Sequence, residues 1–214
     1  MFLITRPFYD DATTYLYYYA GLLMKEAEEK GIAYIELKRP RLTPENFMKI
    51  VKDKNPMFIF FNAHGDEKRI YGDKRTQKED VLVEEDKNHH LLNNKLVYAR
   101  ACWSAASLGK ACIGGCFIGY ETPFRFWHNE AWATKPLNDN VAKQFLEPSN
   151  TIVSALLKGN TAKEAVEKSA LATKKNMLKL LKEKTEPGAI ASIKVLWSNM
   201  DGLEVIGKQD MTLR

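Results

Sequence analysis

Cysteine is scarce in this sequence: the chain of 214 residues has only three, at positions 102, 112 and 116. A small, odd number of cysteines excludes a disulfide framework, and free thiols are typical of a reducing compartment. The sequence also lacks an apolar run near the roughly 18 residues that a membrane span needs. Residues 1–6 are too short for the apolar core of a signal peptide. These absences favour a cytoplasmic protein.

Two kinds of binding site are missing as well. The net charge of +5 is spread along the chain, without the basic stripe and interleaved aromatic residues that are typical of nucleic-acid binding. No glycine-rich phosphate loop follows the first predicted strand, where residues 5–8 are Thr-Arg-Pro-Phe. A flavodoxin-like domain that binds a nucleotide or a flavin therefore ranks low among the alternatives.

The sequence does contain the βαβα alternation of a parallel sheet covered by helices. Its length and its 45% hydrophobic content suit one α/β domain over residues 1–214. Gly31 follows the first apolar helical pattern, and Thr43 with Pro44 begins the second, as expected at helix ends. The pattern predicts helices over 11–30, 43–52 and 161–182, strands over 2–4, 32–37, 117–120 and 203–207, and two further strands in the apolar runs 58–65 and 96–104.

A charged insertion at about 66–95 interrupts this alternation. It holds eight acidic and seven basic residues, and its apolar pieces at 70–71 and 81–83 indicate a small hairpin. A connection of this length in a compact domain tends to be functional. A solvated insertion and a loop that regulates the protein or shapes its substrate site both remain open.

The two apolar runs carry the strongest functional signal, because each ends in a reactive side chain. The first delivers His64, followed by Gly65, and the second delivers Cys102. In open parallel sheets, chemistry gathers beyond the carboxyl ends of the strands. A thiol attacks only as the thiolate, and an imidazole can take its proton and later protonate a leaving group. The pair therefore predicts a Cys–His nucleophile.

Glycine at position 65 has a physical use beside His64. Without a Cβ the backbone can approach a substrate carbonyl, and the N–H groups of Gly65 and Cys102 can together form an oxyanion hole. The competing interpretation is packing, since a free cysteine on a strand is usually a core residue. The placement of both residues at strand ends favours the catalytic interpretation.

These motifs resemble those of the caspase-like cysteine peptidases, and the nearest match is the CHAT subgroup. The resemblance rests on Asn-Ala-His-Gly at 62–65 and Ala-Cys-Trp-Ser at 101–104, and weaker matches lie at 158–165 and 197–207. It implies a three-layer sandwich with a mainly parallel six-stranded sheet and helices on both faces. One departure is Ala-Ala at 105–106, where these families commonly have glycine soon after the Cys-x-Ser.

The resemblance also implies substrate contacts. The residue two before the nucleophile points into the pocket for the P1 side chain in these families, which assigns Arg100 to that pocket and suggests an acidic P1 residue. Asp10 or Asp11 after the first strand is expected to line the same region or to neutralise Arg100 internally. An extended substrate is expected along the edge of the strand at 117–120, near Tyr120 and Thr122.

The sequence thus predicts a cysteine endopeptidase that needs no metal or cofactor, although some relatives use Ca²⁺. Its partners would be a protein or peptide substrate and an activating protein, with neither nucleic acid nor a membrane. The alternative is a catalytically silent caspase-like module with a regulatory or scaffold role. A zinc site at Cys112 and Cys116 is disfavoured, because their spacing is not the usual C-x-x-C.

Overall fold

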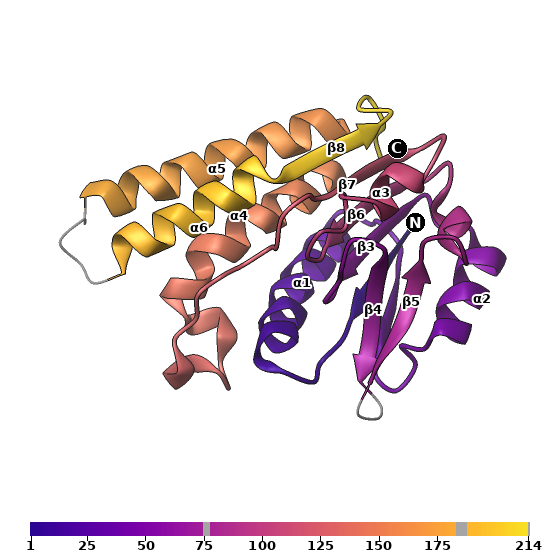
Figure 1. Ribbon diagram of the computed structural model, residues 1–214, viewed down its shortest axis with the longest axis horizontal. Helices are drawn as coiled ribbons and strands as arrows, with labels where there is room; N and C mark the ends of the chain where they lie inside the picture. The colour runs from indigo at the N-terminus through magenta and orange to yellow at the C-terminus, as the bar shows by residue number, and fades with distance from the viewer. Residues whose placement is uncertain (75–77, 183–187, 214) are drawn as a thin grey trace.

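A six-stranded central sheet with helices on both faces forms the centre of the molecule (Figure 1). The structure is a computed structural model that describes residues 1–74, 78–182 and 188–213. In spatial order the strands are β2 (Tyr34–Lys38), β1 (Phe2–Arg6), β3 (Phe58–Asn62), β6 (Leu96–Arg100), β7 (Cys116–Tyr120) and β8 (Leu203–Gly207). Neighbours from β2 to β7 are parallel, and β8 runs antiparallel to β7. The predicted mixed α/β fold with a mainly parallel sheet is confirmed.

Helix caps explain where the helices begin. Asp10 and Thr43 each accept a hydrogen bond from the backbone N–H three residues on, as N-cap side chains do. The helices are α1 (Asp11–Glu29), α2 (Pro44–Lys54), α3 (Leu108–Ala111), α4 (Asn140–Leu157), α5 (Ala162–Lys182) and α6 (Ala189–Asp201), with short 3-10 turns η1 (His89–Leu92), η2 (Glu130–Trp132) and η3 (Pro136–Asn138). Among the described residues, no helix is long and apolar enough to cross a membrane.

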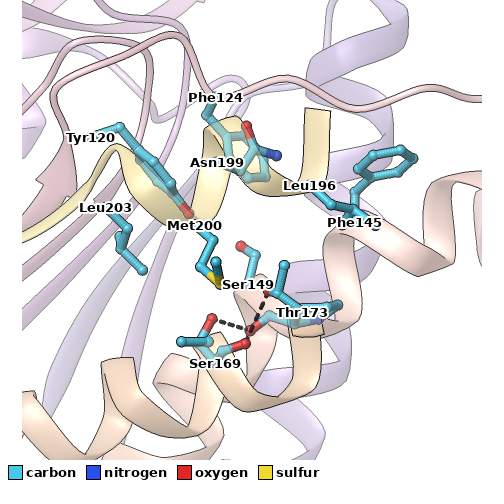
Figure 2. A pocket seen from close by; sticks show the side chains of 12 residues that line it. Tyr120, Phe124, Phe145, Ser149, Ser169, Thr173, Leu196, Asn199, Met200 and Leu203 are labelled. Atoms are coloured by element: carbon cyan, nitrogen blue, oxygen red, sulfur yellow. Dashed lines mark hydrogen bonds between the residues drawn. The ribbon is translucent and has the colours of Figure 1, made fainter. Parts of the chain in front are cut away.

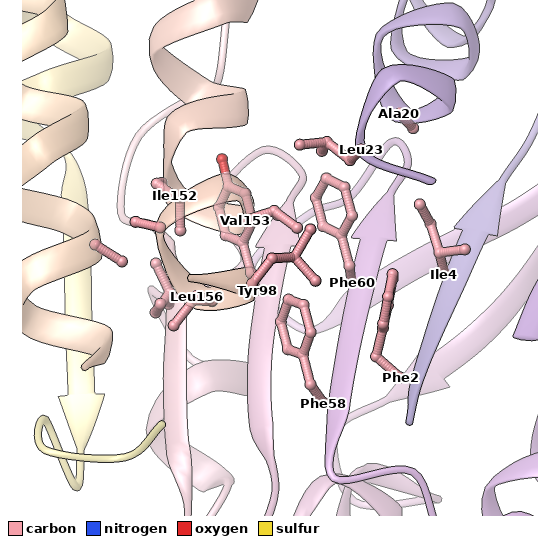
Figure 3. Close-up of a cluster of buried hydrophobic side chains, with 14 of the residues drawn as sticks. Phe2, Ile4, Ala20, Leu23, Phe58, Phe60, Tyr98, Ile152, Val153 and Leu156 are labelled. Carbon is pink, nitrogen blue, oxygen red and sulfur yellow. The ribbon is translucent and has the colours of Figure 1, made fainter. Parts of the chain in front are cut away.

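Both faces of the sheet are buried, which is why its strands are continuous apolar runs. Successive side chains of a strand point to opposite faces. Even-numbered residues of β1, β3 and β6 pack against α1 and α4, including Phe2, Ile4, Phe58, Phe60 and Tyr98 (Figure 3). Odd-numbered residues of the same strands pack against α2, α3 and the hairpin described next: Leu3, Ile59, Phe61, Val97 and Ala99.

The charged insertion contains the hairpin that the sequence indicates. Strand β4 (Arg69–Lys74) pairs antiparallel with β5 (Glu79–Glu84). Ile70, Leu82 and Val83 are fully buried and belong to the core on the α2 face, so this part of the insertion is packed rather than merely solvated. Residues 75–77 of the segment lie outside the described ranges.

Candidate active site

Three neighbouring strands end at the same edge of the sheet, and each is followed by a side chain with catalytic chemistry. Asp10 follows β1, His64 follows β3 and Cys102 follows β6. The last paired residues of β3 and β6 are Asn62 and Arg100, so His64 and Cys102 stand two residues beyond the same rung of the ladder. Because β1 pairs with β3 on its other side, the structure places the imidazole between the carboxylate and the thiol in strand order.

His64 and Asp10 are directly hydrogen-bonded. His64 Nε2 lies 2.8 Å from Asp10 Oδ2, and this bond, opposed by burial and helped by the charges of Asp10 and Glu79, raises the pKa of His64. Burial by itself raises the pKa of Asp10, but hydrogen bonds from His64 and Thr13 outweigh it and bring that pKa to about 2. Asp10 is therefore ionised at neutral pH and holds the imidazole through Nε2, which leaves Nδ1 for another partner.

Residues around this pair fix its position. Thr13 donates its backbone N–H to Asp10 Oδ1 over 2.7 Å, because Asp10 is also the N-cap of α1. The ring of Tyr9 lies 6.0 Å from the His64 ring between centroids, and the Tyr9 hydroxyl donates to the carboxylate of Glu79. Glu79 begins β5, so the hairpin of the charged insertion reaches the surroundings of His64.

The thiol of Cys102 is neutral in this state. Cys102 Sγ lies 3.6 Å from the carbonyl oxygen of Phe124, to which it donates. Burial raises the pKa of Cys102, and the backbone hydrogen bond with Phe124 and the positive charge of Arg125 oppose this only in part. Near neutral pH the thiol is therefore protonated, and it is carried by the strand next to the one that carries His64, whose own pKa is raised.

Gly65 brings the chain after His64 against the backbone of Cys102. A methyl group added at Gly65 would lie 3.1 Å from the carbonyl oxygen of Cys102 and 3.0 Å from the Cβ of Ala101. Within the described ranges, no backbone carbonyl oxygen accepts a hydrogen bond from the N–H of Gly65 or of Cys102. Neither donor is therefore used by the backbone at the junction of the two segments.

Arg100 does not reach this edge, and its predicted contact with substrate is not supported by its position. It is 0% exposed, because its even-numbered place on β6 turns it beneath α1 and α4. Its guanidinium donates to Asn62, Ser149 and Asn150, and it also lies over the ring of Phe60. These partners are neutral, so the expected neutralisation by Asp10 or Asp11 is wrong as well.

Tyr120 is likewise an interior residue and not a substrate contact. It is buried, and its hydroxyl lies 3.0 Å from that of Tyr98. Figure 2 shows its ring beside Phe124 at a cavity between β7 and helices α4, α5 and α6. The cavity volume is about 20 Å³, which is room for a single water molecule and not for a peptide side chain.

An extended substrate cannot pair with β7 as expected, because β7 has no free edge. It pairs with β6 on one side and with β8 on the other, and the carbonyl oxygen of Thr122 just beyond it accepts the backbone N–H of Trp103 over 3.2 Å. The hydroxyl of Thr122 faces the carbonyl oxygen of Ser198 at the end of α6. Thr122 thus supports the turn that carries Cys102.

One sequence pattern indicates where Asp10 lies: the N-cap pattern of the first helix. An Asp followed three residues later by Thr, just before an apolar helical pattern, is typical of a helix N-cap. That cap places Asp10 in the short connection between β1 and α1, and β1 is the neighbour of the strand that His64 follows. The contact between the two side chains follows from this placement.

Comparisons with known proteins identify the class of fold. No protein-family model and no curated protein matches this sequence. The fold matches the Arg-specific cysteine proteinase gingipain R (RgpB), with a TM-score of 0.64 at 12% identity over 100% of this chain and 47% of that chain. It also matches a complex of Porphyromonas gingivalis RgpB pro- and mature domains, with a TM-score of 0.57 at 12% identity over 100% of this chain and 48% of that one.

The chain therefore has the caspase-like fold of gingipain, a cysteine proteinase, and spans about half the length of the solved structures that it matches. An identity of 12% establishes the fold and leaves the chemistry to the residues of this chain. These two matches do not show the CHAT subgroup that the sequence motifs indicate.

Proposed function

We propose that this chain is a cysteine peptidase in which Cys102 is the nucleophile and His64 is the general base and acid. One observation carries the proposal: the ends of three adjacent strands bring Cys102, His64 and Asp10 to one edge of the sheet, with Asp10 bonded to the imidazole. A nucleophile, a base and a group that orients the base form the recurring arrangement of covalent hydrolases. The gingipain fold supports the same class of reaction.

The reaction follows from the positions of these groups. His64 takes the thiol proton of Cys102, and the sulfur attacks the peptide carbonyl carbon, so that a C–S bond forms. The oxyanion accepts the N–H groups of Gly65 and Cys102. As the C–N bond breaks, His64 gives its proton to the leaving amine and a thioester remains. His64 then takes a proton from water, whose oxygen attacks the thioester carbon; the C–S bond breaks, the carboxylic acid product leaves, and His64 returns the proton to the thiolate of Cys102.

The thiol of Cys102 is protonated and bonded to a carbonyl oxygen, so we expect the binding of substrate or of a partner protein to bring it into contact with His64. Cys102 donates to the carbonyl oxygen of Phe124, so its proton must pass to His64 before attack. Catalytic contacts of this kind often tighten only in the complex with substrate. Control by a protein segment is in keeping with the complex between the pro- and mature domains of RgpB. The β4–β5 hairpin is the element by which such control would reach His64, because its Glu79 accepts from Tyr9 and its charge acts on His64.

A peptide-cleavage assay tests the proposal. The purified chain is incubated with a library of internally quenched peptides before and after alkylation with iodoacetamide, and the modified residue is located by mass spectrometry. We expect cleavage that disappears in proportion to modification of Cys102. Cleavage that persists after complete alkylation of Cys102 contradicts the proposal. The absence of cleavage across the library, with and without limited proteolysis of the chain, favours the scaffold alternative.

The hydrogen bond from His64 to Asp10 predicts a specific change in pH dependence. Replacing Asp10 with asparagine keeps a good N-cap for α1 but removes the charge that raises the pKa of His64. The base must be neutral to act, so the acid limb of the kcat/KM profile moves to lower pH. The plateau falls by between about 10- and 10⁴-fold, because the imidazole loses its orienting partner.

Asp11 provides the matched control for this variant. It is the neighbouring carboxylate, and its side chain lies 3.7 Å from His128 rather than near His64. Asp11→Asn is expected to leave both the acid limb and the plateau unchanged. An Asp10→Asn profile that coincides with that of the wild type would show that Asp10 does not act on His64 in the working enzyme.

Gly65→Ala is expected to lower kcat while leaving KM nearly unchanged. The added methyl group would lie 3.0 Å from the carbonyl oxygen of Arg69 and 3.1 Å from that of Cys102, so the 65–66 backbone must shift away from the nucleophile. Loss of one oxyanion donor costs about 10²- to 10³-fold in kcat. Steady-state kinetics measure the effect, and an unchanged rate of Cys102 alkylation shows that the thiol itself is intact. If Gly65→Ala weakened substrate binding by the same factor as it lowered kcat/KM, an oxyanion role for Gly65 would be contradicted.

A further inference from the structure

A surface hollow adjoins the catalytic pair on the side where the chain leaves both strand ends. It has a volume of about 360 Å³ and is lined by Trp103, which follows Cys102, and by residues 66–69, which follow Gly65. This volume lies within the range of small-ligand sites. None of the sequence-predicted substrate residues lines it, so its position raises the question of which part of a substrate it would receive.

Trp103, which lines this hollow, has an unusual backbone conformation. Its φ is +51°, in the left-handed region that a bulky residue rarely adopts. Its N–H is bonded to the carbonyl oxygen of Thr122 and its own carbonyl oxygen accepts the N–H of Ala106, so both sides of the residue are fixed. The side chain is 39% exposed. Strained residues with an exposed aromatic ring are typical of ligand sites.

The reaction direction defines which side of a peptide lies there. His64 must protonate the leaving amine, so the residues that follow the cleaved bond lie on the His64 side of Cys102. The segment directly after His64 and Gly65 forms one wall of the hollow, and Trp103 forms the other. An extended peptide at Cys102 therefore runs into this hollow with its leaving-group portion.

The charged residues that line the hollow have no net charge, so they do not favour a charged ligand. The four charged residues that line it, at 66–69, comprise two of each sign. Asp66 accepts the Tyr71 hydroxyl over 2.6 Å, and Arg69 is paired with Glu84 at 3.1 Å, so neither charge is free to select a substrate. The other two, Glu67 and Lys68, have opposite signs, so the lining carries no net charge. The indole of Trp103 is its large apolar surface, and it favours an aromatic or large aliphatic side chain.

We propose that the hollow beside Trp103 binds the side chain of the substrate residue directly after the cleaved bond, and that Trp103 selects a large apolar residue there. This inference rests on the proposed peptidase function and names its leaving-group specificity. Trp103 acts as a specificity residue through contact with the substrate, not as an acid, a base or a nucleophile.

A pair of matched peptides tests the inference in the working enzyme. Two internally quenched peptides differ only in Phe or Gly directly after the cleaved bond, and the measured quantity is the ratio of their kcat/KM values. We expect the wild type to favour Phe by at least about tenfold and Trp103→Ala to reduce the ratio to about one. Trp132→Ala, which removes an indole that is also 39% exposed, retains the wild-type ratio. A wild-type ratio near one, or a ratio unaffected by Trp103→Ala, overturns the inference.

A binding experiment separates this inference from the peptidase proposal. The chain has four tryptophans, and the indole N–H signal of Trp103 is assigned in a ¹⁵N NMR spectrum by its loss in Trp103→Phe. Phe-Ala amide, which resembles the leaving portion of a substrate, is expected to shift this signal, and Gly-Ala amide is not. A shift without any peptide cleavage keeps the subsite and refutes the peptidase; cleavage without a shift or a Phe preference refutes the subsite.

Discussion

Replacing Cys102 with alanine is expected to reduce peptide hydrolysis on the order of 10⁶-fold, to the residual level that binding alone provides. Of the three cysteines in the described residues, Cys102 is the one that follows a strand ending at the edge where Asp10 and His64 meet. Without the thiol no C–S bond forms, and water would have to attack the peptide directly. The measurement is kcat/KM with the best peptide of the library, combined with thermal melting to show that the variant is folded.

The two remaining cysteines are matched controls. Burial raises the pKa of both Cys112 and Cys116 to about 12, and Cys116 lies in the core at the start of β7. Cys112→Ala and Cys116→Ala are expected to retain wild-type kcat/KM wherever the protein remains folded. If the activity of Cys102→Ala matched that of either control, the assignment of the nucleophile would be wrong.

Replacing Asn62 with leucine is expected to destabilise the fold by about 3–5 kcal/mol, because it leaves the buried charge of Arg100 with fewer partners. Asn62 Oδ1 accepts from Arg100 Nε at 3.0 Å and also from Nη2, and the whole guanidinium is enclosed. Such a loss corresponds to a fall of roughly 6–20 °C in Tm for a protein of this size. The free energy of unfolding from denaturant titration measures it.

A double variant tests whether the charge is the cause. In the Asn62→Leu background, Arg100→Met removes the charge that the leucine leaves unsatisfied, so the pair should be markedly more stable than Asn62→Leu alone. The same pair of residues ends β3 and β6, directly before the segments that carry His64 and Cys102. If the two effects simply added, the cost would come from packing or from the lost bond of Asn62 to Thr5, and not from the buried charge.

Much of the fold was predictable because both faces of the sheet are buried. Continuous apolar strands alternating with capped helices indicate a parallel sheet, and most predicted ends lie within one or two residues of those in the structure. The runs at 58–65 and 96–104 extend further, because β3 ends at Asn62 and β6 at Arg100 and the residues that follow form the site. The positions of His64 and Cys102 at one edge follow from the same rule. The sequence of a single strand does not show which other segments pack against it in the fold.

The errors at the site come from that missing information. The family resemblance assigns Arg100 to the substrate pocket at Cys102, but Arg100 is inside the sheet against α4 whereas Cys102 lies beyond the end of β6. Tyr120 was assigned to a free strand edge, and β8, from the far end of the chain, covers that edge. Asp10 was assigned to substrate or to Arg100, and the geometry gives it to His64 instead. Each outcome depends on contacts between segments distant in sequence.

The most direct test of the proposed chemistry is a crystal structure of the chain with a peptide aldehyde bound, made from the best substrate of the library. We predict a covalent bond from Cys102 Sγ to the aldehyde carbon, with its oxygen hydrogen-bonded by the N–H groups of Gly65 and Cys102 and with His64 still bonded to Asp10. The leaving-group side of the bound carbon should face Trp103. An aldehyde attached at another residue, or an oxygen directed away from Gly65, would contradict the proposed site.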